Sequence, residues 1–297
     1  MYKINFQEPI HIHFIGIGGI SMSGLAEILF EEHFTISGSD SKESELTRHL
    51  EHMGMQIFYG QKASNIIEGI DLIVYTAAIR EDNPEFAAAK EKGIPMLSRA
   101  ELLGQIMDNY QNSIAVSGTH GKTTTTSMIS QILLAAKKDP TITVGGILKA
   151  IDGNLRVGKS DVFISEACEY TNSFLNFRPK YSIILNIEAE HLDFFKDIHD
   201  IRNSFHLFAK NTKENGAIII NGEIENYQEI VEGLAPQVIT YGMSDACDFY
   251  PADITFNEKA CANFTAMIPR RESHGCRPKC TRTAQCFECT RCHCACP

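Results

Sequence analysis

The most constraining feature of this sequence is a short apolar segment that runs into a glycine-rich loop and then into a helix-forming stretch. Residues 113–117, SIAVS, predict a buried strand, and the loop that follows reads GTHGKTTTT from Gly118 to Thr126. An apolar helix pattern, SMISQILLAA, comes next. This order is typical of a P-loop, in which backbone N–H groups cradle phosphates. The segment therefore predicts a nucleotide-phosphate site at the end of a strand.

The residue types in this loop predict how phosphates and a metal ion would be held. Lys122 can neutralise the β- and γ-phosphates, and the hydroxyl of Thr123 can bind Mg²⁺. Val116 occupies the first glycine position of the usual pattern, so the loop is shorter than normal. A turn without a nucleotide is the alternative, but GKTTTT in this context favours a nucleotide. The candidate ATP-binding residues are Gly118, Thr119, His120, Gly121, Lys122, Thr123 and Thr124.

Two further strand patterns end in polar residues that can face the same site. The first ends at Glu166 and the second at Asn186, and the stretch NIEAEHLDFF then brings His191. Because the carboxyl ends of parallel strands open onto the crevice that holds the ligand, these side chains are expected beside the phosphates. Glu166 and His191 therefore suit a second metal position beside the phosphates. The alternative is that His191 caps a helix and Glu166 makes a surface ion pair.

A second glycine-rich turn lies near the N-terminus. The strand pattern IHIHFI runs into GIGGISMSG, in which Gly16 allows a tight turn and Gly18 and Gly19 let a ligand approach the backbone. The helix that follows offers free N–H groups to a phosphate. Asp40 ends the second strand, where a carboxylate can bind ribose hydroxyls. Because Ser21 replaces the third glycine of the dinucleotide fingerprint, the turn indicates a nucleotide diphosphate rather than NAD specifically; a turn without a ligand is the alternative.

Strands alternate with helices along most of the chain, which predicts two α/β units with doubly wound, mostly parallel sheets. We expect a first domain over residues 1–108 and a second over 109–267, because 297 residues are too many for one ordinary core. The expected strands are 11–15, 34–40, 56–58, 71–75, 96–97, 113–117, 161–165, 181–185, 217–220 and 237–241. The expected helices are 21–32, 43–53, 84–92, 99–107, 127–136, 200–210 and 225–232.

Charge and apolar patterning argue against several classes of protein. Lys and Arg number 27 against 37 Asp and Glu, a net charge of −10, which disfavours a general nucleic-acid or anionic-membrane binder. The longest apolar stretches have the length of strands, so no membrane span is expected. The N-terminus MYKINFQEPI lacks the features of a signal peptide. We therefore expect a cytoplasmic enzyme without nucleic-acid or membrane partners, and its oligomeric state stays open.

Residues 268–297 differ from the rest of the chain in composition. They contain six Lys or Arg and two Asp or Glu, a net charge of +4, whereas residues 1–267 carry −14. Seven of the ten cysteines lie in this stretch, and CFECTRCHC contains two overlapping C-x-x-C pairs of the kind that bind zinc. The interpretation that we favour is that this stretch is foreign to the protein and disordered.

Four stretches, in order along the chain, resemble the Mur ligases of peptidoglycan synthesis: HFIGIGGISMSGLAEIL, GTHGKTTTT, EACEYTNSFL and NIEAEHLDFFKD. SRAELLG around Arg99 and TAAI around Thr76 fit the same family, and the resemblance covers residues 10 to about 267. His120 stands where related folate and later Mur ligases usually have Asn. This residue indicates the branch that joins L-alanine to UDP-N-acetylmuramate. The rival with the same loop is the ligase that attaches a murein tripeptide to this UDP-sugar.

The resemblance implies a reaction and a role for each motif. ATP would phosphorylate the muramate carboxylate to an acyl phosphate, and the amine of L-alanine would then displace phosphate. The residues implied in catalysis are Lys122, Glu166, His191 and Asn186, with Mg²⁺ held by Thr123, Glu166 and His191. The residues implied in binding UDP-N-acetylmuramate are Gly16, Gly18, Gly19, Ser21, Asp40, Thr76 and Arg99. Ser21 departs from the usual Gly of the family.

The resemblance also gives residues 268–297 a different explanation. One legitimate choice of codons for residues 279–297, read one base out of frame, gives VPGRHNVLNA, which is similar to the segment that closes the family's central domain. We therefore expect a frameshift after about residue 267. No stretch of the sequence corresponds to the family's third domain, so we expect a truncated chain that is inactive or impaired. A non-catalytic nucleotide-binding fragment and an NAD-dependent oxidoreductase are the alternatives.

Overall fold

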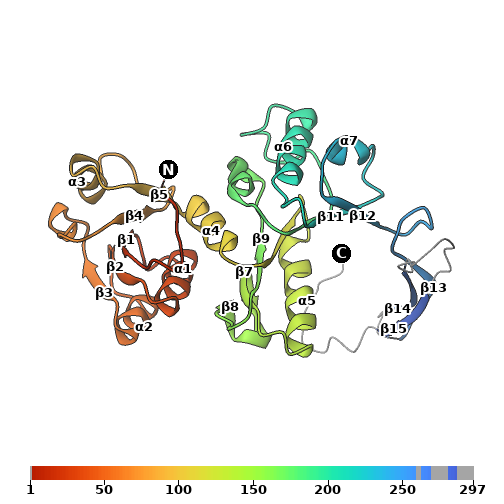
Figure 1. The fold of residues 1–297 in the computed structure, drawn as a ribbon, viewed down its shortest axis with the longest axis horizontal. Helices are drawn as coiled ribbons and strands as arrows, with labels where there is room; N and C mark the ends of the chain where they lie inside the picture. Colours follow the sequence, from red (N-terminus) through yellow and green to blue (C-terminus); the bar gives the residue numbers. More distant parts are fainter. Residues whose placement is uncertain (1, 259–261, 269–279, 286–297) are drawn as a thin grey trace.

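Two α/β units lie side by side in the computed structural model, which describes residues 2–258, 262–268 and 280–285 (Figure 1). The first unit is built on a five-stranded parallel sheet with the order β3-β2-β1-β4-β5. Its strands are β1 (His11–Ile15), β2 (Thr35–Asp40), β3 (Gln56–Tyr59), β4 (Leu72–Tyr75) and β5 (Met96–Ser98). Its helices are α1 (Ile20–Glu31), α2 (Glu45–Met53), η1 (Ala63–Asn65), α3 (Pro84–Glu91) and α4 (Arg99–Asp108).

Strand β1 shows how alternating side chains build a core on each face of this sheet. Ile12 and Phe14 point to one face and belong to the same buried cluster as the inward residues of α1. Ile15 points to the other face and packs with Ile73 and with Ala89 of α3. Because successive side chains of a strand alternate between faces, a strand that is apolar at all these positions must be covered on both sides.

Capping residues fix the start of helices α3 and α4 in the first unit. The Ser98 hydroxyl accepts from the Glu101 N–H at 3.3 Å, and the Ser98 N–H donates to the Glu101 carboxylate at 2.7 Å. This capping box starts α4 and sets the position of Arg99. The Asn83 side chain accepts from the Glu85 N–H at 2.9 Å and caps α3. Both helices therefore begin at defined positions beside the carboxyl edge of the sheet.

The second unit contains a seven-stranded sheet with the order β12-β11-β10-β6-β9-β7-β8, in which every neighbouring pair is parallel except β7 and β8. Its strands are β6 (Asn112–Ser117), β7 (Thr141–Leu148), β8 (Gly153–Arg156), β9 (Val162–Glu166), β10 (Tyr181–Ile184), β11 (Ala217–Asn221) and β12 (Gln237–Tyr241). Its helices are α5 (Lys122–Ala135), η2 (Lys149–Ile151), η3 (Tyr170–Asn176), α6 (Ile198–Lys210) and α7 (Gln228–Val231).

A small antiparallel sheet follows the second unit. Strand β14 (Ala262–Ile268) lies between β13 (Tyr250–Phe256) and β15 (Cys280–Gln285). Seven residues of the stretch expected to be disordered, Ile268 and those of β15, are therefore described as parts of strands. Residues 269–279 and 286–297 lie outside the described residues, and they include six of the seven cysteines behind the zinc interpretation. The disorder and the frameshift stay predictions, as do the domain boundaries near residues 108 and 267.

Glycines allow the two units to approach each other closely. Helix α4 of the first unit packs against η3 of the second, and a Cβ atom on Gly104 would lie less than 3.0 Å from the carbonyl oxygen of Asn176. At Gly24 of α1, a Cβ atom would lie 3.3 Å from the methyl groups of Leu155 in β8. These two close contacts bring α4 and α1 of the first unit against η3 and β8 of the second unit.

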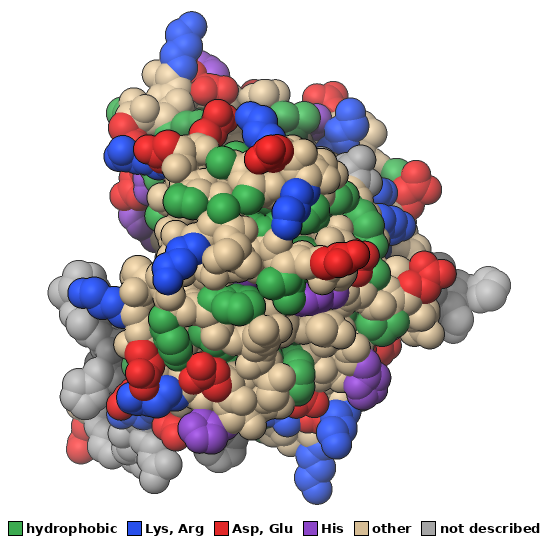
Figure 2. Space-filling model, turned by 90° about the vertical axis from the view of Figure 1, so that its left-hand side faces the viewer, with side chains coloured by type: hydrophobic (Ala, Val, Ile, Leu, Met, Phe, Trp, Pro, Cys, Tyr) green, Lys and Arg blue, Asp and Glu red, His purple; other side chains and the backbone are tan. Residues whose placement is uncertain are grey.

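The sequence-based fold class is confirmed, since both large sheets are mainly parallel and their strands alternate with helices. The hairpin of β7 and β8 was not among the expected strands, and the helix expected over 225–232 is reduced to the four residues of α7. Among the described residues, no helix combines the length and apolarity needed to cross a bilayer. Figure 2 shows basic and acidic side chains interspersed over the face of the first unit, without a separate basic region on that face.

Buried His13 predicts that the first unit loses stability in acid. Its side chain is fully buried and shares the Ser37 hydroxyl with His11, at 2.9 and 2.8 Å. Burial lowers the pKa of His13 to about 4. The unfolded chain therefore binds more protons between pH 6.5 and 4, and about 3 kcal/mol of the unfolding free energy should be lost over that range. Urea unfolding at several pH values measures this, and His13→Leu should flatten the slope; an equally steep slope in that variant would contradict the assignment.

Candidate active site

The P-loop has the backbone conformation that its glycines predict. Gly118 has a φ of +146° and Gly121 a φ of +80°, and Gly121 is the N-cap of α5. A Cβ atom on Gly118 would lie 2.9 Å from the Cβ of Leu185. No side chain caps the N-terminus of α5, so its first N–H groups are available to phosphate oxygens. The loop is therefore shaped as an anion cradle.

Asn186 holds this loop from the neighbouring strand β10. Its side chain oxygen accepts from the His120 N–H at 2.7 Å, and its side chain nitrogen donates to the His120 carbonyl at 3.1 Å. Its own carbonyl accepts from the Thr119 N–H at 3.2 Å. The structure thus brings Asn186 to the P-loop, as the sequence predicted, but its contacts are with the loop backbone. Its direct role in catalysis stays a prediction.

Lys122 points back into the loop and meets an acidic residue that sequence reasoning missed. Its ammonium group donates to the carbonyls of Gly118 and Thr119 at 2.5 and 3.0 Å. It also lies 2.9 Å from the carboxylate of Glu169, whose side chain is only 2% exposed. In the sequence, Glu169 is simply the second acidic residue of EACE. Its burial against Lys122 shows that it belongs to the site.

The structure brings two of the three predicted metal ligands together. Thr123 donates its hydroxyl hydrogen to Glu166 at 3.0 Å, and Glu166 also accepts from the Gly145 N–H at 2.5 Å. A hydroxyl and a carboxylate at the end of a P-loop fit Mg²⁺, which prefers oxygen ligands. Within the described part of the chain, however, no three His, Cys, Asp or Glu side chains form a metal-binding group. The three-residue ligand set stays a prediction.

His191 lies on the other side of Glu169 in a conformation held by its neighbours. Its Nε2 is 3.4 Å from the Glu169 carboxylate, and its backbone has a φ of +55°, in the left-handed region. Tyr170 packs on the imidazole with ring centroids 4.7 Å apart, and the Tyr170 hydroxyl donates to Asp193 at 2.7 Å. Glu169 therefore joins Lys122 and His191, and Tyr170 is a second residue that the sequence did not single out.

The N-terminal glycine turn is closed by groups from strand β2. Gly16 has a φ of +85°, and its N–H donates to the Ser39 carbonyl at 2.8 Å. The Gly18 N–H donates to the Asp40 carboxylate at 2.9 Å. A Cβ on Gly18 would lie 2.8 Å from that carboxylate, whereas Gly19 has room and is the N-cap of α1. Asp40 thus lies at the turn as predicted, but it binds the turn itself.

The remaining predicted substrate residues lie around the same turn. Arg99 donates to the Ser21 hydroxyl at 3.2 Å, so the N-terminus of α4 reaches the N-terminus of α1. A Cβ on Gly16 would lie 3.9 Å from the methyl group of Thr76, which follows β4. No acidic residue lies in the first turn of α1, and no side chain caps it. The cation and the free helix N-terminus together favour an anion here.

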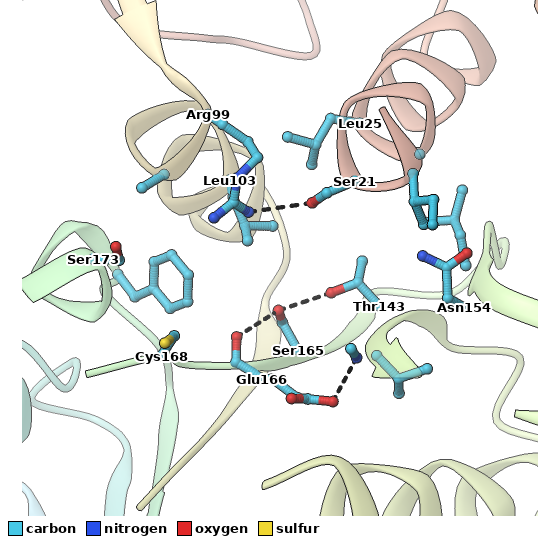
Figure 3. Close-up of a pocket in the computed structure, with 17 residues that line it drawn as sticks. Ser21, Leu25, Arg99, Leu103, Thr143, Asn154, Ser165, Glu166, Cys168 and Ser173 are labelled. Carbon is cyan, nitrogen blue, oxygen red and sulfur yellow. Dashed lines mark hydrogen bonds between the residues drawn. The ribbon is translucent and has the colours of Figure 1, made fainter. Parts of the chain in front are cut away.

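One pocket lies between the two units, beside the N-terminal ends of α1 and α4 on one side and the carboxyl end of β9 on the other (Figure 3). Figure 3 shows Arg99 and Ser21 on one side of this pocket, and Ser165, Thr143 and Glu166 on the other. The pocket has a volume of about 160 Å³. Its lining residues are Ile20, Ser21, Gly24, Leu25, Arg99, Ala100, Leu103, Thr143, Val144, Gly145, Asn154, Leu155, Ser165, Glu166, Cys168, Ser173 and Phe177. Two predicted substrate residues, Ser21 and Arg99, therefore face the same space as one predicted metal ligand, Glu166.

Comparison with known proteins places both units in one family. Residues 11–111 match the family described as Mur ligase family, catalytic domain, and residues 116–277 match the Mur ligase middle domain. The UDP-N-acetylmuramate–L-alanine ligase of Agathobacter rectalis is 74% identical over 267 residues, which are 90% of this chain and 58% of that protein. The enzyme of the same name from Lachnospira eligens is 58% identical over 90% of this chain and 59% of its own length.

Solved structures agree with this placement. UDP-N-acetylmuramate–alanine ligase from Thermotoga maritima has a TM-score of 0.68 at 29% identity, covering 91% of this chain and 60% of that chain. A ligase from Neisseria meningitidis named for UDP-N-acetylmuramate and L-alanyl-γ-D-glutamyl-meso-diaminopimelate has a TM-score of 0.75 at 27% identity, covering 88% and 85%. The chain spans little more than half the length of the curated relatives that it matches.

Proposed function

We propose that this chain, which belongs to the Mur ligase family, holds the sites with which an ATP-dependent ligase joins L-alanine to UDP-N-acetylmuramate. The observation that carries the proposal is the shared pocket, lined by Arg99 and Ser21 from the first unit and by Glu166 from the second. A substrate carboxylate near Arg99 would face phosphates bound at the P-loop. The names of the curated relatives support these substrates.

The residues of the second unit would prepare a phosphoryl transfer. The N–H groups at the start of α5 and the ammonium of Lys122 would hold the ATP phosphates. Mg²⁺, held by Thr123 and Glu166 with His191 as the third proposed ligand, would supply further neutralisation of phosphate charge. An oxygen of the muramate carboxylate attacks the γ-phosphorus, and the bond to the β–γ bridging oxygen breaks to release ADP. The alanine amine then attacks the acyl carbon, loses a proton, and phosphate leaves with the bonding electrons.

A second candidate function is the attachment of a murein peptide to the same UDP-sugar. The similarity to the Neisseria meningitidis ligase supports it, since that structure has a higher TM-score than the Thermotoga maritima enzyme. The sequence identity to alanine ligases favours L-alanine. The two functions share the nucleotide-sugar and ATP sites, so they differ only in the amine that attacks. We expect either enzyme to work in the cytoplasm, where ATP is available.

Ligand binding to the intact chain tests the proposal directly. UDP-N-acetylmuramate and ADP with Mg²⁺ should each raise the Tm, whereas NAD should not. Arg99→Ala should weaken binding of the UDP-sugar about 10- to 100-fold, because a charged hydrogen bond contributes about 1.5–3 kcal/mol. Arg48→Ala, which removes an exposed cation paired with Glu43 on the same unit, is the control and should bind normally. A Tm increase with NAD and none with the UDP-sugar would overturn the proposed function.

A further inference from the structure

A buried carboxylate lies beneath the glycine turn, outside the proposed reaction. Glu85 is on α3, and its side chain is fully buried. It accepts a hydrogen bond from the Ser39 hydroxyl at 2.5 Å and another from the side chain nitrogen of Asn65. Among the described residues, Glu85 forms no ion pair with a Lys, Arg or His. Its negative charge is therefore balanced by neutral donors alone.

These donors belong to two segments beside the predicted nucleotide-sugar site, strand β2 for Ser39 and η1 for Asn65. Ser39 lies next to the end of β2, and its carbonyl accepts from the N–H groups of Gly16 and Ile17 at 2.8 and 2.9 Å. Asn65 also donates to the carbonyl of Gly60, at 2.9 Å. Through Ser39 and Asn65, Glu85 thus connects α3 with the glycine turn after β1, the end of β2 and the loop after β3.

Further hydrogen bonds join the loop after β3 to the end of β2 and to the start of α3. The Gly60 N–H donates to the Asp40 carbonyl at 2.8 Å, and Asp40 itself accepts from Gly18 through its carboxylate. The Asn83 side chain caps α3 and donates to the side chain of Gln61. All these segments lie at the carboxyl edge of the first sheet, where ligands of doubly wound folds bind.

Stability alone is a poor explanation for a charge at this position. Burial raises the pKa of Glu85, while hydrogen bonds from Ser39, from Asn65 and from the backbone of Lys62 act in the opposite direction. Burying a carboxylate without a cation is unfavourable, and an apolar side chain of similar size would fill the space without that penalty. A carboxylate does have one distinct property here, because both of its oxygens can only accept when it is ionised. It can therefore hold several donor groups in one arrangement.

We propose that Glu85 is a positioning residue that holds the loops of the nucleotide-sugar site in their binding arrangement. This inference rests on the proposed function, because it assigns a UDP-sugar to the first unit. Glu85 acts through Ser39 on the N–H groups of the glycine turn and through Asn65 on the loop that supports Asp40. It makes no contact with the P-loop. Its loss should therefore affect the UDP-sugar and leave ADP binding unchanged.

Glu85→Gln is the variant that tests this role. The amide keeps the size of the side chain, but its nitrogen cannot accept. Either the Asn65 N–H then loses its acceptor, or the Ser39 hydroxyl must turn from donor to acceptor. We expect the Kd for UDP-N-acetylmuramate to rise about 10-fold, which is about 1.4 kcal/mol, because one hydrogen bond of the network is lost or reversed. The Kd for ADP with Mg²⁺ should stay within twofold. Glu91→Gln, on the exposed side of the same helix, is the matched control and should leave both constants unchanged.

Two further measurements separate positioning from a loss of folding. Ser39→Ala removes one donor with little change in volume, and it should also weaken the UDP-sugar selectively. In ¹⁵N-glycine-labelled protein without ligand, Glu85→Gln should shift the amide signals of Gly16 and Gly60 but not those of Gly118 and Gly121. Equal UDP-sugar affinity in wild type, Glu85→Gln and Ser39→Ala would overturn the inference while the proposed function stands. No UDP-sugar binding by the wild type would overturn both.

Discussion

Gly104→Ala is expected to lower the unfolding free energy by about 2–3 kcal/mol, although alanine is the better helix former. The added methyl group would lie less than 3.0 Å from the backbone carbonyl oxygen of Asn176 in η3. Because that oxygen belongs to the backbone, no side chain rotation can relieve the overlap, and α4 must move away from η3. The gain of about 1 kcal/mol in helix propensity is too small to compensate. Urea unfolding of the two proteins measures the difference.

The same change should also weaken ligand binding, since α4 begins with Arg99 and η3 contributes Ser173 to the shared pocket. We expect the Kd for UDP-N-acetylmuramate to rise, while the Kd for ADP stays unchanged. Gly24→Ala is the matched control: the atoms nearest to its methyl group are side chain atoms of Leu155, from 3.3 Å, which can move, so stability should change by no more than about 0.5 kcal/mol. Equal stability of Gly104→Ala and wild type would show that the two units do not pack as closely as described.

Local patterns allowed much of the fold to be predicted from sequence. A strand, a glycine turn and a helix follow one another at Gly16 and again at Gly118, as expected, although α5 begins at Lys122, inside the expected loop, rather than at residue 127. The glycines have positive φ values at the positions where the turns require them. Such motifs are predictable because the strand, the turn and the helix N-terminus are encoded by neighbouring residues. Contacts with the rest of the fold contribute little to the conformation of these motifs.

Contacts between distant segments could not be predicted in the same way. The β7–β8 hairpin contains Gly145 and Gly146, followed by Ile147 with 84% of its surface exposed, so apolar alternation is lost along β7. Strand β8 is a half-buried edge strand without a clear pattern. From the sequence alone, Glu85 would be expected to be an exposed residue in the first turn of a helix. Only pairing with Ser39, 46 residues away, shows that it is buried.

In the candidate site, too, positions set by local sequence patterns were predicted, whereas contacts between distant segments were not. Its strand-end residues were predicted because parallel strands bring their carboxyl ends to one edge, and Glu166 and Asn186 do reach the P-loop. Their partners were not predicted. Asn186 binds loop backbone, and His191 pairs with Glu169. Sequence gives no distances between side chains that reach one edge from different strands, so it cannot say which pairs will meet.

Lys122→Met should separate the two roles of the lysine, in stability and in nucleotide binding. Lys122 is 16% exposed and Glu169 only 2%, so methionine would leave a buried carboxylate without its cation. Breaking a buried pair in this way costs about 3–5 kcal/mol. ADP affinity should also fall about 100-fold, because the charged contact with the phosphates is lost. Urea unfolding and ADP titration of the same samples measure both effects.

A second substitution should restore stability without restoring binding. In Lys122→Met/Glu169→Gln no charge is left unpaired between these positions, so most of the lost unfolding free energy should return, while ADP affinity stays about 100-fold weak. Glu169→Gln alone keeps the lysine and its bonds to the carbonyls of Gly118 and Thr119, and we expect ADP to bind within a few-fold of wild type. If the double variant were as unstable as Lys122→Met, the unpaired carboxylate would not be the cause of the instability. Glu169 would then act at this site mainly through His191.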